Sequence, residues 1–162
     1  MLKPAQLYQD ELNKKYINTW YDDRYMYYRS YGTGIIELPK DNYDNHHFVS
    51  VDDNDDIIGY MSYHINWNIK TANAFGIISF DIGNVMFLRD IKRATDDIFY
   101  KYNLNRIEWF CVADNPAIKG YRKFIKRHGG RECGYLRETA LLSDGKLHDD
   151  VFFEILKCEY KE

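Results

Sequence analysis

The 162 residues suffice for one domain with a hydrophobic core and are too few for two ordinary ones. Apolar residues make up 45%, which excludes a disordered chain, and the net charge of −3 argues against general nucleic-acid binding. No apolar run approaches membrane-spanning length, and Cys111, Cys133 and Cys158 form no CxxC pair. We therefore expect a reduced, cytoplasmic protein that binds neither membranes nor nucleic acid.

The N-terminal part of the sequence predicts helices and loops. Pro4 suits the first turn of a helix over 4–16, in which apolar residues recur at every fourth position. The aromatic segment 18–31 predicts either a second helix or irregular structure. Glycines and a proline then interrupt the chain, and a loop is expected over 40–46.

Alternating patterns then predict three strands. Two strand-like runs flank an acidic turn at 52–56, which indicates a hairpin. In the second run Met61, Tyr63 and Ile65 share one face, as in a half-buried strand. A third strand is expected over 74–82.

The second half of the sequence alternates helices and strands. A helix is expected over 85–102, with an apolar face formed by Leu88, Ile91, Thr95, Ile98 and Tyr102. The run 106–112 is apolar on both faces, which is typical of a central strand. Asn115 can cap and Pro116 can start a short helix that ends at Gly129 and Gly130.

The C-terminal segments 131–142 and 149–160 predict a closing antiparallel hairpin around a turn at 143–145. The order of elements predicts one α/β domain with a mixed sheet. The strand–helix–strand unit from Ile77 to Val112 should join two parallel strands.

Residue patterns for several other chemistries are weak. The histidines show no four-ligand spacing, so no metal is expected; they are His46, His47, His64, His128 and His148. Cys111 lies inside an apolar strand, where a thiol is usually inert. No GxSxG motif and no Walker loop is present, which gives no support to a serine hydrolase or a nucleotide triphosphatase.

The basic helix after Pro116 allows two interpretations on its own. Its cations are typical of a solvated helix face, and those near the C-terminal end interact favourably with the helix dipole. The alternative is a nucleic-acid patch over 119–131, which the acidic clusters at 52–56 and 149–150 disfavour.

The segment IEWFCVADNPAIKGYRKF, residues 107–124, resembles the GNAT superfamily of acetyl-CoA-dependent N-acetyltransferases. The family pattern is an Asn followed by a Tyr, a lysine and an apolar residue. The resemblance runs from about Phe48 to Tyr160. It implies one GNAT-like α/β domain over 1–162, with a mixed, mostly antiparallel sheet splayed at a central parallel pair and helices on both faces. Residues 1–45 would form a helical acceptor-side region, and residues 46–162 the sheet core and CoA-binding half.

The family's glycine-rich pyrophosphate motif is reduced here to Gly83, in a shorter loop. The spacing from Asn115 to Tyr121 is also one residue tighter than is commonest in the family. A helix N-terminus can still supply unpaired N–H groups, and nearby arginine or lysine can add charge. The residues expected to bind acetyl-CoA are Ser79, Phe80, Ile82, Gly83, Asn84, Val85, Met86, Phe87, Arg89, Asn115 and Lys123.

The resemblance gives Tyr121 the role of protonating the departing thiolate, and the alternative is that it only fills the core. A base must remove a proton from an ammonium of pKa about 10.4, and Asp81, Glu108 and His64 all remain candidates. Backbone N–H groups near 80–82 are expected to bind the oxyanion. Aromatic residues of 20–28 either pack on the sheet or line the acceptor site; they are Trp20, Tyr21, Tyr25, Tyr27 and Tyr28.

The resemblance implies direct transfer of an acetyl group from acetyl-CoA, as co-substrate, to the primary amine of a small-molecule or peptide acceptor, and no metal is expected. The alternative is a catalytically inactive GNAT-like module for binding or regulation, because the glycine motif is reduced. The closing hairpin would also allow a homodimer.

Overall fold

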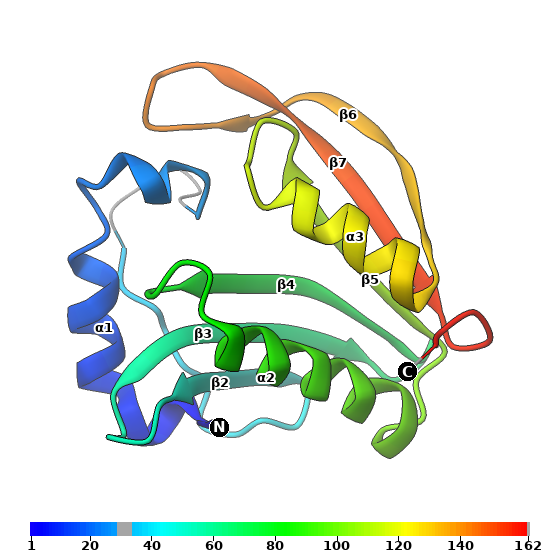
Figure 1. Cartoon of the computed structure of the whole chain (residues 1–162), viewed down its shortest axis with the longest axis horizontal. Helices are drawn as coiled ribbons and strands as arrows, with labels where there is room; N and C mark the ends of the chain where they lie inside the picture. The colour runs from blue at the N-terminus through cyan, green and yellow to red at the C-terminus, as the bar shows by residue number, and fades with distance from the viewer. Residues whose placement is uncertain (29–33, 162) are drawn as a thin grey trace.

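A computed structural model describes residues 1–28 and 34–161 (Figure 1). Its core is a seven-stranded sheet in the order β1-β2-β3-β4-β5-β7-β6. The strands are β1 (Leu2–Pro4), β2 (Asn45–Val51), β3 (Ile57–Asn66), β4 (Thr71–Ser79), β5 (Arg106–Val112), β6 (Arg131–Leu141) and β7 (Leu147–Leu156). Every neighbouring pair is antiparallel except β4 and β5. The predicted mixed sheet with one central parallel pair is therefore confirmed.

The parallel strands β4 and β5 pair over a short stretch only. Their register contains Thr71 opposite Arg106 and Ala72 opposite Ile107. Beyond this point the two strands diverge (Figure 1). Ala74 has a φ of 52°, and the β3–β4 register shifts between Ser62 and His64. This irregularity is a β-bulge, which bends β4 away from its neighbour and explains the splay.

The splay divides the sheet into an N-terminal arm, β1 to β4, and a C-terminal arm, β5 to β7. On one face lie α2 (Val85–Asp96), with its π-helical extension η3 (Asp97–Lys101), and α3 (Ile118–His128). The opposite face of the N-terminal arm is covered by η1 (Ala5–Tyr8), α1 (Gln9–Ile17) and η2 (Asp23–Tyr28). The predicted placement of helices on both faces is confirmed.

Two hydrophobic clusters hold these layers together. The first packs Ala94, Ile98 and Ile118 of the helices against Trp109 and Phe153 of the sheet. The second packs Leu12 and Tyr25 against β2, β3 and β4, and lies wholly within the N-terminal arm. No helix of the described residues is long and apolar enough to span a membrane.

Two predicted boundaries at the start of the chain were wrong. The helix expected over 4–16 begins only at Gln9, because Leu2–Pro4 pair with the edge of β2 and a 3₁₀ turn follows. Pro4 itself has an extended conformation. The region 1–45 is therefore not helical throughout. The loop expected over 40–46 ends earlier, since β2 begins at Asn45. Of the segment 18–31, residues 23–28 form η2 and residues 29–31 lie outside the described part.

Later boundaries also shift. The strand expected over 74–82 spans Thr71–Ser79, and the closing strands end and begin a few residues from the predicted positions. The α-helix expected over 85–102 widens into a π-helical turn after Asp96. Leu88, expected on its buried face, is 57% exposed, whereas Phe87 and Asp90 are buried. The buried face predicted for the start of this helix was therefore wrong by one residue.

Candidate active site

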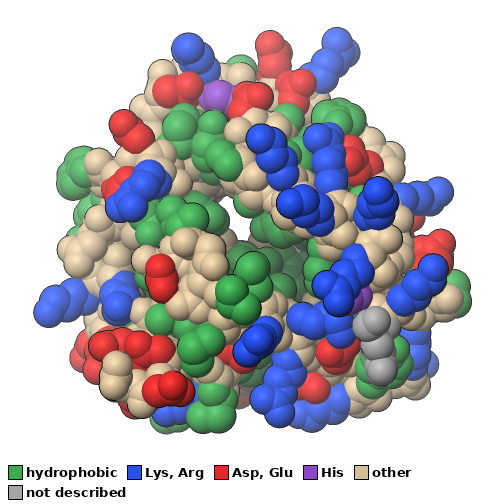
Figure 2. All heavy atoms as spheres, in the orientation of Figure 1, with side chains coloured by type: hydrophobic (Ala, Val, Ile, Leu, Met, Phe, Trp, Pro, Cys, Tyr) green, Lys and Arg blue, Asp and Glu red, His purple; other side chains and the backbone are tan. Residues whose placement is uncertain are grey.

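The candidate site is the cleft opened where β4 and β5 separate. Figure 2 shows a hollow at the centre of the molecule, bordered by hydrophobic side chains. Residues 75–79 of β4 and 109–112 of β5 form its walls and have no register partner across it. One edge of β4 thus presents unpaired backbone groups to the cleft, which is the arrangement that can accept an extended ligand as an additional strand.

Tyr121 projects from α3 onto the C-terminal wall of this cleft. Its half-buried ring packs at 5.9 Å against Trp109 and at 5.9 Å against Phe153. Burial raises the pKa of the Tyr121 hydroxyl, and the nearby Cys111 and Tyr28 raise it further. The hydroxyl stays protonated at neutral pH and has no hydrogen-bond partner among the described residues. Such a group can donate a hydrogen bond to a ligand.

Asn115 lies at the end of β5, where α3 is about to begin. It is buried, and its side-chain oxygen accepts a hydrogen bond from the backbone N–H of Ala117 at 2.9 Å. Asn115 also hydrogen-bonds the thiol of Cys111, whose pKa is raised to about 12 by burial and by the charge of Asp150. The helix-capping role of Asn115 is therefore present.

The N-terminus of α2 is capped by its own chain. The Asn84 side-chain oxygen accepts hydrogen bonds from Met86 N–H at 2.9 Å and Phe87 N–H at 3.3 Å. The Asn84 amide nitrogen donates to Asp81 at 2.7 Å. Two of the backbone donors predicted to hold a pyrophosphate are thus occupied, and a phosphate must displace the Asn84 side chain to reach them.

The loop between β4 and α2 departs from expectation in a second way. Because β4 ends at Ser79, Phe80 and Asp81 are no longer strand residues. Their N–H groups both donate to the carbonyl of Ile58, at 2.9 Å and 3.3 Å. These two amides are therefore engaged with β3 and cannot bind an oxyanion as predicted. Gly83, with a φ of 87°, and the exposed Ile82, Val85 and Arg89 complete the loop and the first turns of α2.

The three candidate bases do not converge. Glu108 lies at the closed end of the cleft, where it pairs with Arg106 at 2.7 Å and accepts from Asn73 at 3.4 Å. His64 lies opposite Asn73, near the same end, with its ring bonded to Asn45. Asp81 lies at the open end, bonded to Asn84. Only Asp81 thus shares the open end of the cleft with Tyr121.

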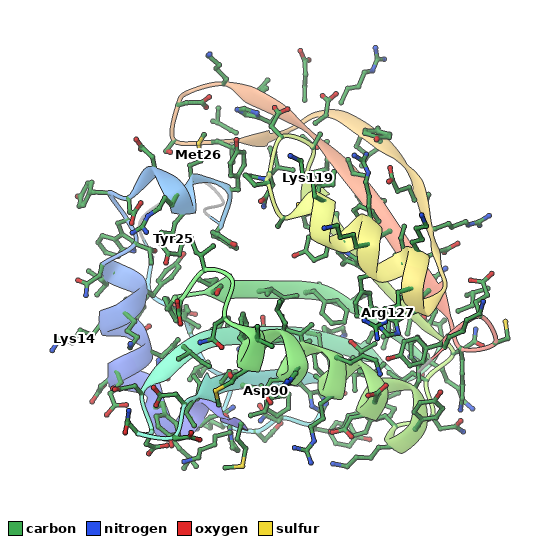
Figure 3. The ribbon with its side chains drawn as sticks, in the orientation of Figure 1. Lys14, Tyr25, Met26, Asp90, Lys119 and Arg127 are labelled. Atoms are coloured by element: carbon green, nitrogen blue, oxygen red, sulfur yellow. The ribbon has the colours of Figure 1, made fainter. Side chains whose placement is uncertain are left out.

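Positive charge gathers on the exposed side of α3, beside the hollow (Figure 2). Arg122 is held by Glu132 at 2.6 Å, but Lys123 has no ion-pair partner in the described part of the chain. Lys119 and Arg127 lie on the same helix (Figure 3). These cations can approach the phosphates of a ligand in the cleft. Within residues 1–28 and 34–161, no group of three potential ligands for a metal ion is found.

Sequence reasoning did not identify how η2 reaches the cleft. Tyr25 is buried in the second cluster, and its hydroxyl donates to the Phe80 carbonyl at 3.4 Å, at the end of β4 (Figure 3). The Tyr28 ring lies 5.7 Å from that of Tyr25 and is close enough to influence the hydroxyl of Tyr121. Tyr21, by contrast, is 91% exposed. The predicted aromatic wall is therefore divided, and only part of it borders the cleft.

Comparison with known proteins gives structural matches only. No protein-family model matches the chain, and no curated protein sequence does. A spermidine N-acetyltransferase from Vibrio cholerae, solved in complex with CoA and spermine, matches with a TM-score of 0.74 and 23% identity, covering 99% of this chain and 96% of that one. SpeG spermidine/spermine N-acetyltransferase from the same organism, in complex with manganese ions, matches at 0.61 with 26% identity, over 72% of this chain and 67% of that one. A dodecameric structure of spermidine N-acetyltransferase from V. cholerae matches with a TM-score of 0.63 and 28% identity, over 72% of this chain and 67% of that one.

The sheet has a splayed parallel pair within an otherwise antiparallel order, and a tyrosine-bearing helix follows the second of these strands. The chain has the fold of the N-acetyltransferases that it matches in structure, as the resemblance to the GNAT superfamily predicted. Its loop between β4 and α2 departs from the GNAT pyrophosphate motif, because the loop has one glycine and caps the helix through Asn84.

Proposed function

We propose that this protein transfers the acetyl group of acetyl-CoA directly to a primary amine of an acceptor bound in the same cleft. The single observation that carries the proposal is the short pairing of β4 and β5, which leaves a wall of unpaired backbone groups beside Tyr121. The similarity to spermidine N-acetyltransferases supports it and makes polyamines the first acceptors to test.

The arm of acetyl-CoA would add to the free edge of β4 along residues 75–79, since residues 80 and 81 bond to β3 instead. The amide nitrogen of Asn115 would bond the arm from the opposite wall. Lys123 would attract the phosphates, and the first turn of α2 would bind them once the Asn84 side chain swings away. The exposed apolar side chains Ile82 and Val85 would cover the arm.

In the proposed reaction the acceptor enters as an ammonium and first loses a proton. Asp81, at the open end of the cleft, is the carboxylate best placed to accept that proton, directly or through water. Glu108 stays a weaker candidate because Arg106 holds it. The amine nitrogen then attacks the thioester carbonyl carbon, the carbon–nitrogen bond forms and the carbon–sulfur bond breaks. The departing thiolate receives a hydrogen bond or proton from Tyr121, which the raised pKa keeps protonated. After attack the nitrogen loses its second proton, which restores the Tyr121 hydroxyl, so the products are the acetamide, CoA thiol and the one proton that the base releases.

The rival candidate is a GNAT-shaped module that binds without catalysis, and the self-capped N-terminus of α2 favours it. Two measurements separate the candidates. At a hundred times its dissociation constant, acetyl-CoA should stabilise the fold by about 2.7 kcal/mol in thermal denaturation. With spermidine added, the enzyme should also release CoA thiol in proportion to acetylated amine. Stabilisation without thiol release, over a panel of polyamines, amino acids and peptides, would favour the module.

A further inference from the structure

Asp150 is a buried carboxylate with no ion-pair partner among residues 1–28 and 34–161. It is 7% exposed and lies on β7, opposite Val112 at the end of β5. One carboxylate oxygen accepts from the Thr139 hydroxyl at 2.9 Å. The other oxygen is buried without any hydrogen-bond partner among the described residues. A buried unpaired carboxylate oxygen opposes folding, so a fold retains one only if something else requires it.

The second buried aspartate in the described part of the chain shows what is missing. Asp90 is 8% exposed, and its carboxylate accepts from the Ser50 hydroxyl at 2.7 Å. A positively charged amine, the ammonium of Met1, lies 3.0 Å from the same carboxylate. Asp150 has the hydroxyl partner, but the described part of the chain places no such cation beside it. The comparison indicates that the counter-charge of Asp150 comes from a bound ligand.

The position of Asp150 identifies the side of the cleft that such a ligand would occupy. Val151 and Phe153 face α3 in the first cluster, and side chains alternate along a strand. Asp150 therefore faces the opposite side, as does Phe152, whose ring lies 5.6 Å from Phe110. This is the side on which η2 meets the end of β4. The negative charge of Asp150 is also close enough to affect the Cys111 thiol, which in turn affects Tyr121.

We propose that Asp150 binds an ammonium group of the acceptor at the open end of the cleft, and that the acceptor is consequently a cationic amine. That the bound amine is the acetyl acceptor rests on the proposed function, whereas the binding of an ammonium group at Asp150 does not. A charge-assisted hydrogen bond from the ammonium would satisfy the unpaired oxygen. Acetyl-CoA would enter from the face of α2 and α3, and the cationic amine from the face of η2.

The test compares Asp150→Asn with Asp149→Asn in the full chain. Asn keeps the shape of Asp150 and its bond to Thr139, but removes the charge. Asp149, whose carboxylate accepts from the Glu138 N–H at 2.9 Å, is the matched control, since an Asn oxygen can accept the same bond. Spermidine is the probe for amine binding, and acetyl-CoA is the probe for the other side of the cleft. Calorimetry and thermal shift measure the binding of both.

We expect Asp150→Asn to weaken spermidine binding by tenfold or more, and to leave the acetyl-CoA affinity within twofold of wild type. We also expect its Tm to rise by about 2–4 °C, because the unpaired buried charge is gone. A purely structural aspartate would give a lower Tm with unchanged spermidine binding, and this result would overturn the proposal. Weaker acetyl-CoA binding with unchanged spermidine binding would overturn it too, since the orphan oxygen would then serve the cofactor arm.

Failure of the proposed function and failure of this inference give different results. If wild-type protein binds spermidine through Asp150 but never binds acetyl-CoA, acetyl transfer is wrong and the ammonium site stands. If acetyl-CoA binds, and spermidine raises the Tm of Asp150→Asn and Asp149→Asn equally, acetyl transfer stands and Asp150 is not the ammonium-binding site. If wild-type protein binds no spermidine and no other cationic amine of the panel, the ammonium site is refuted.

Discussion

The two arms of the sheet differ in how completely they are covered. β3, in the N-terminal arm, is packed on both faces, with α2 on one side and α1 and η2 on the other. In the C-terminal arm α3 covers one face, while Phe110 and Leu136 are more than half exposed. An edge strand such as β6 is exposed along most of its length. The N-terminal arm is thus covered on both faces, whereas the C-terminal arm, which carries Tyr121, Asn115 and Asp150, is covered by a helix on one face only.

This difference matters for a cleft between the arms. Only the short contact at Thr71 and Ala72, together with the Asn73–Glu108 hydrogen bond, ties β4 to β5 directly. A wall that is lightly packed can adjust to a ligand, whereas the wall formed by β4 is fixed by its pairing with β3. Substitutions in the two arms should therefore have different consequences for stability and for activity.

The largest effect is expected from the Tyr121 hydroxyl, on the C-terminal wall. Tyr121→Phe keeps the ring between Trp109 and Phe153 but removes the donor for the thiolate. We expect kcat to fall by about 100-fold, or about 2.7 kcal/mol of transition-state stabilisation, with acetyl-CoA binding nearly unchanged.

Steady-state kinetics and calorimetry with acetyl-CoA measure this change. Tyr21→Phe is the control, since the Tyr21 side chain is 91% exposed to solvent. Unchanged kcat in Tyr121→Phe would mean that the tyrosine only fills the core of the C-terminal arm.

The next largest effect is expected on stability, when glycine is replaced by alanine in each of the two arms. An added Cβ at Gly59 of β3 would lie 2.6 Å from the Phe87 ring, so Gly59→Ala should destabilise the fold by about 1–3 kcal/mol. Gly120, in α3, has nothing within 4 Å of such a Cβ, so Gly120→Ala should stabilise by about 0.5–1 kcal/mol through helix propensity. Urea unfolding of both variants measures the two signs. Equal signs would mean that the arms are packed alike at these sites.

The same contrast explains what the sequence allowed us to predict. The order of the elements after β1 followed from the hydrophobic patterns along the chain, and the parallel pair followed from the strand–helix–strand unit between Ile77 and Val112. β1 was missed because three residues contain no period, and only pairing with β2 makes them a strand. The bounds of β4 were misplaced because an irregularity at Ala74, which has a φ of 52°, breaks the alternation that the prediction used.

The site was less predictable than the fold. Tyr121 and Asn115 belong to a local motif, from which they were proposed as site residues. Asp150 belongs to an acidic pair at the start of a strand, which in a sequence indicates a solvated position, and its burial depends on contacts with distant residues such as Thr139. The occupied amides of Phe80 and Asp81 likewise depend on the Ile58 carbonyl, some twenty residues away in the chain.

A smaller effect should appear in the pH dependence of stability, with opposite signs in the two arms. In the N-terminal arm burial lowers the pKa of His46, so its contribution to stability falls as pH decreases through the ordinary value of about 6.5. In the C-terminal arm Asp114 and Asp144 raise the pKa of His148. That contribution is fully present below the ordinary value and is lost as pH rises through the folded-state pKa.

Urea unfolding at pH values of about 8 and about 5.5 tests both signs. His46→Phe, which can retain stacking on Tyr63, should reduce the loss of stability on acidification. His148→Gln should cost more stability at the lower pH than at the higher. If both variants change the pH profile in the same direction, the opposite pKa shifts assigned to the two arms are wrong.

The smallest effect is expected from a single exposed cation beside the cleft. Lys123→Ala, on the C-terminal arm, should weaken acetyl-CoA binding by about two- to fivefold at low ionic strength, because exposed charges contribute about 0.3–1 kcal/mol. The loss should vanish in high salt, where such a charge is screened. Lys14→Ala removes a cation from α1, which covers the N-terminal arm, and should leave binding unchanged (Figure 3). Equal losses in both variants would mean that net charge, and not a phosphate contact at α3, attracts the cofactor.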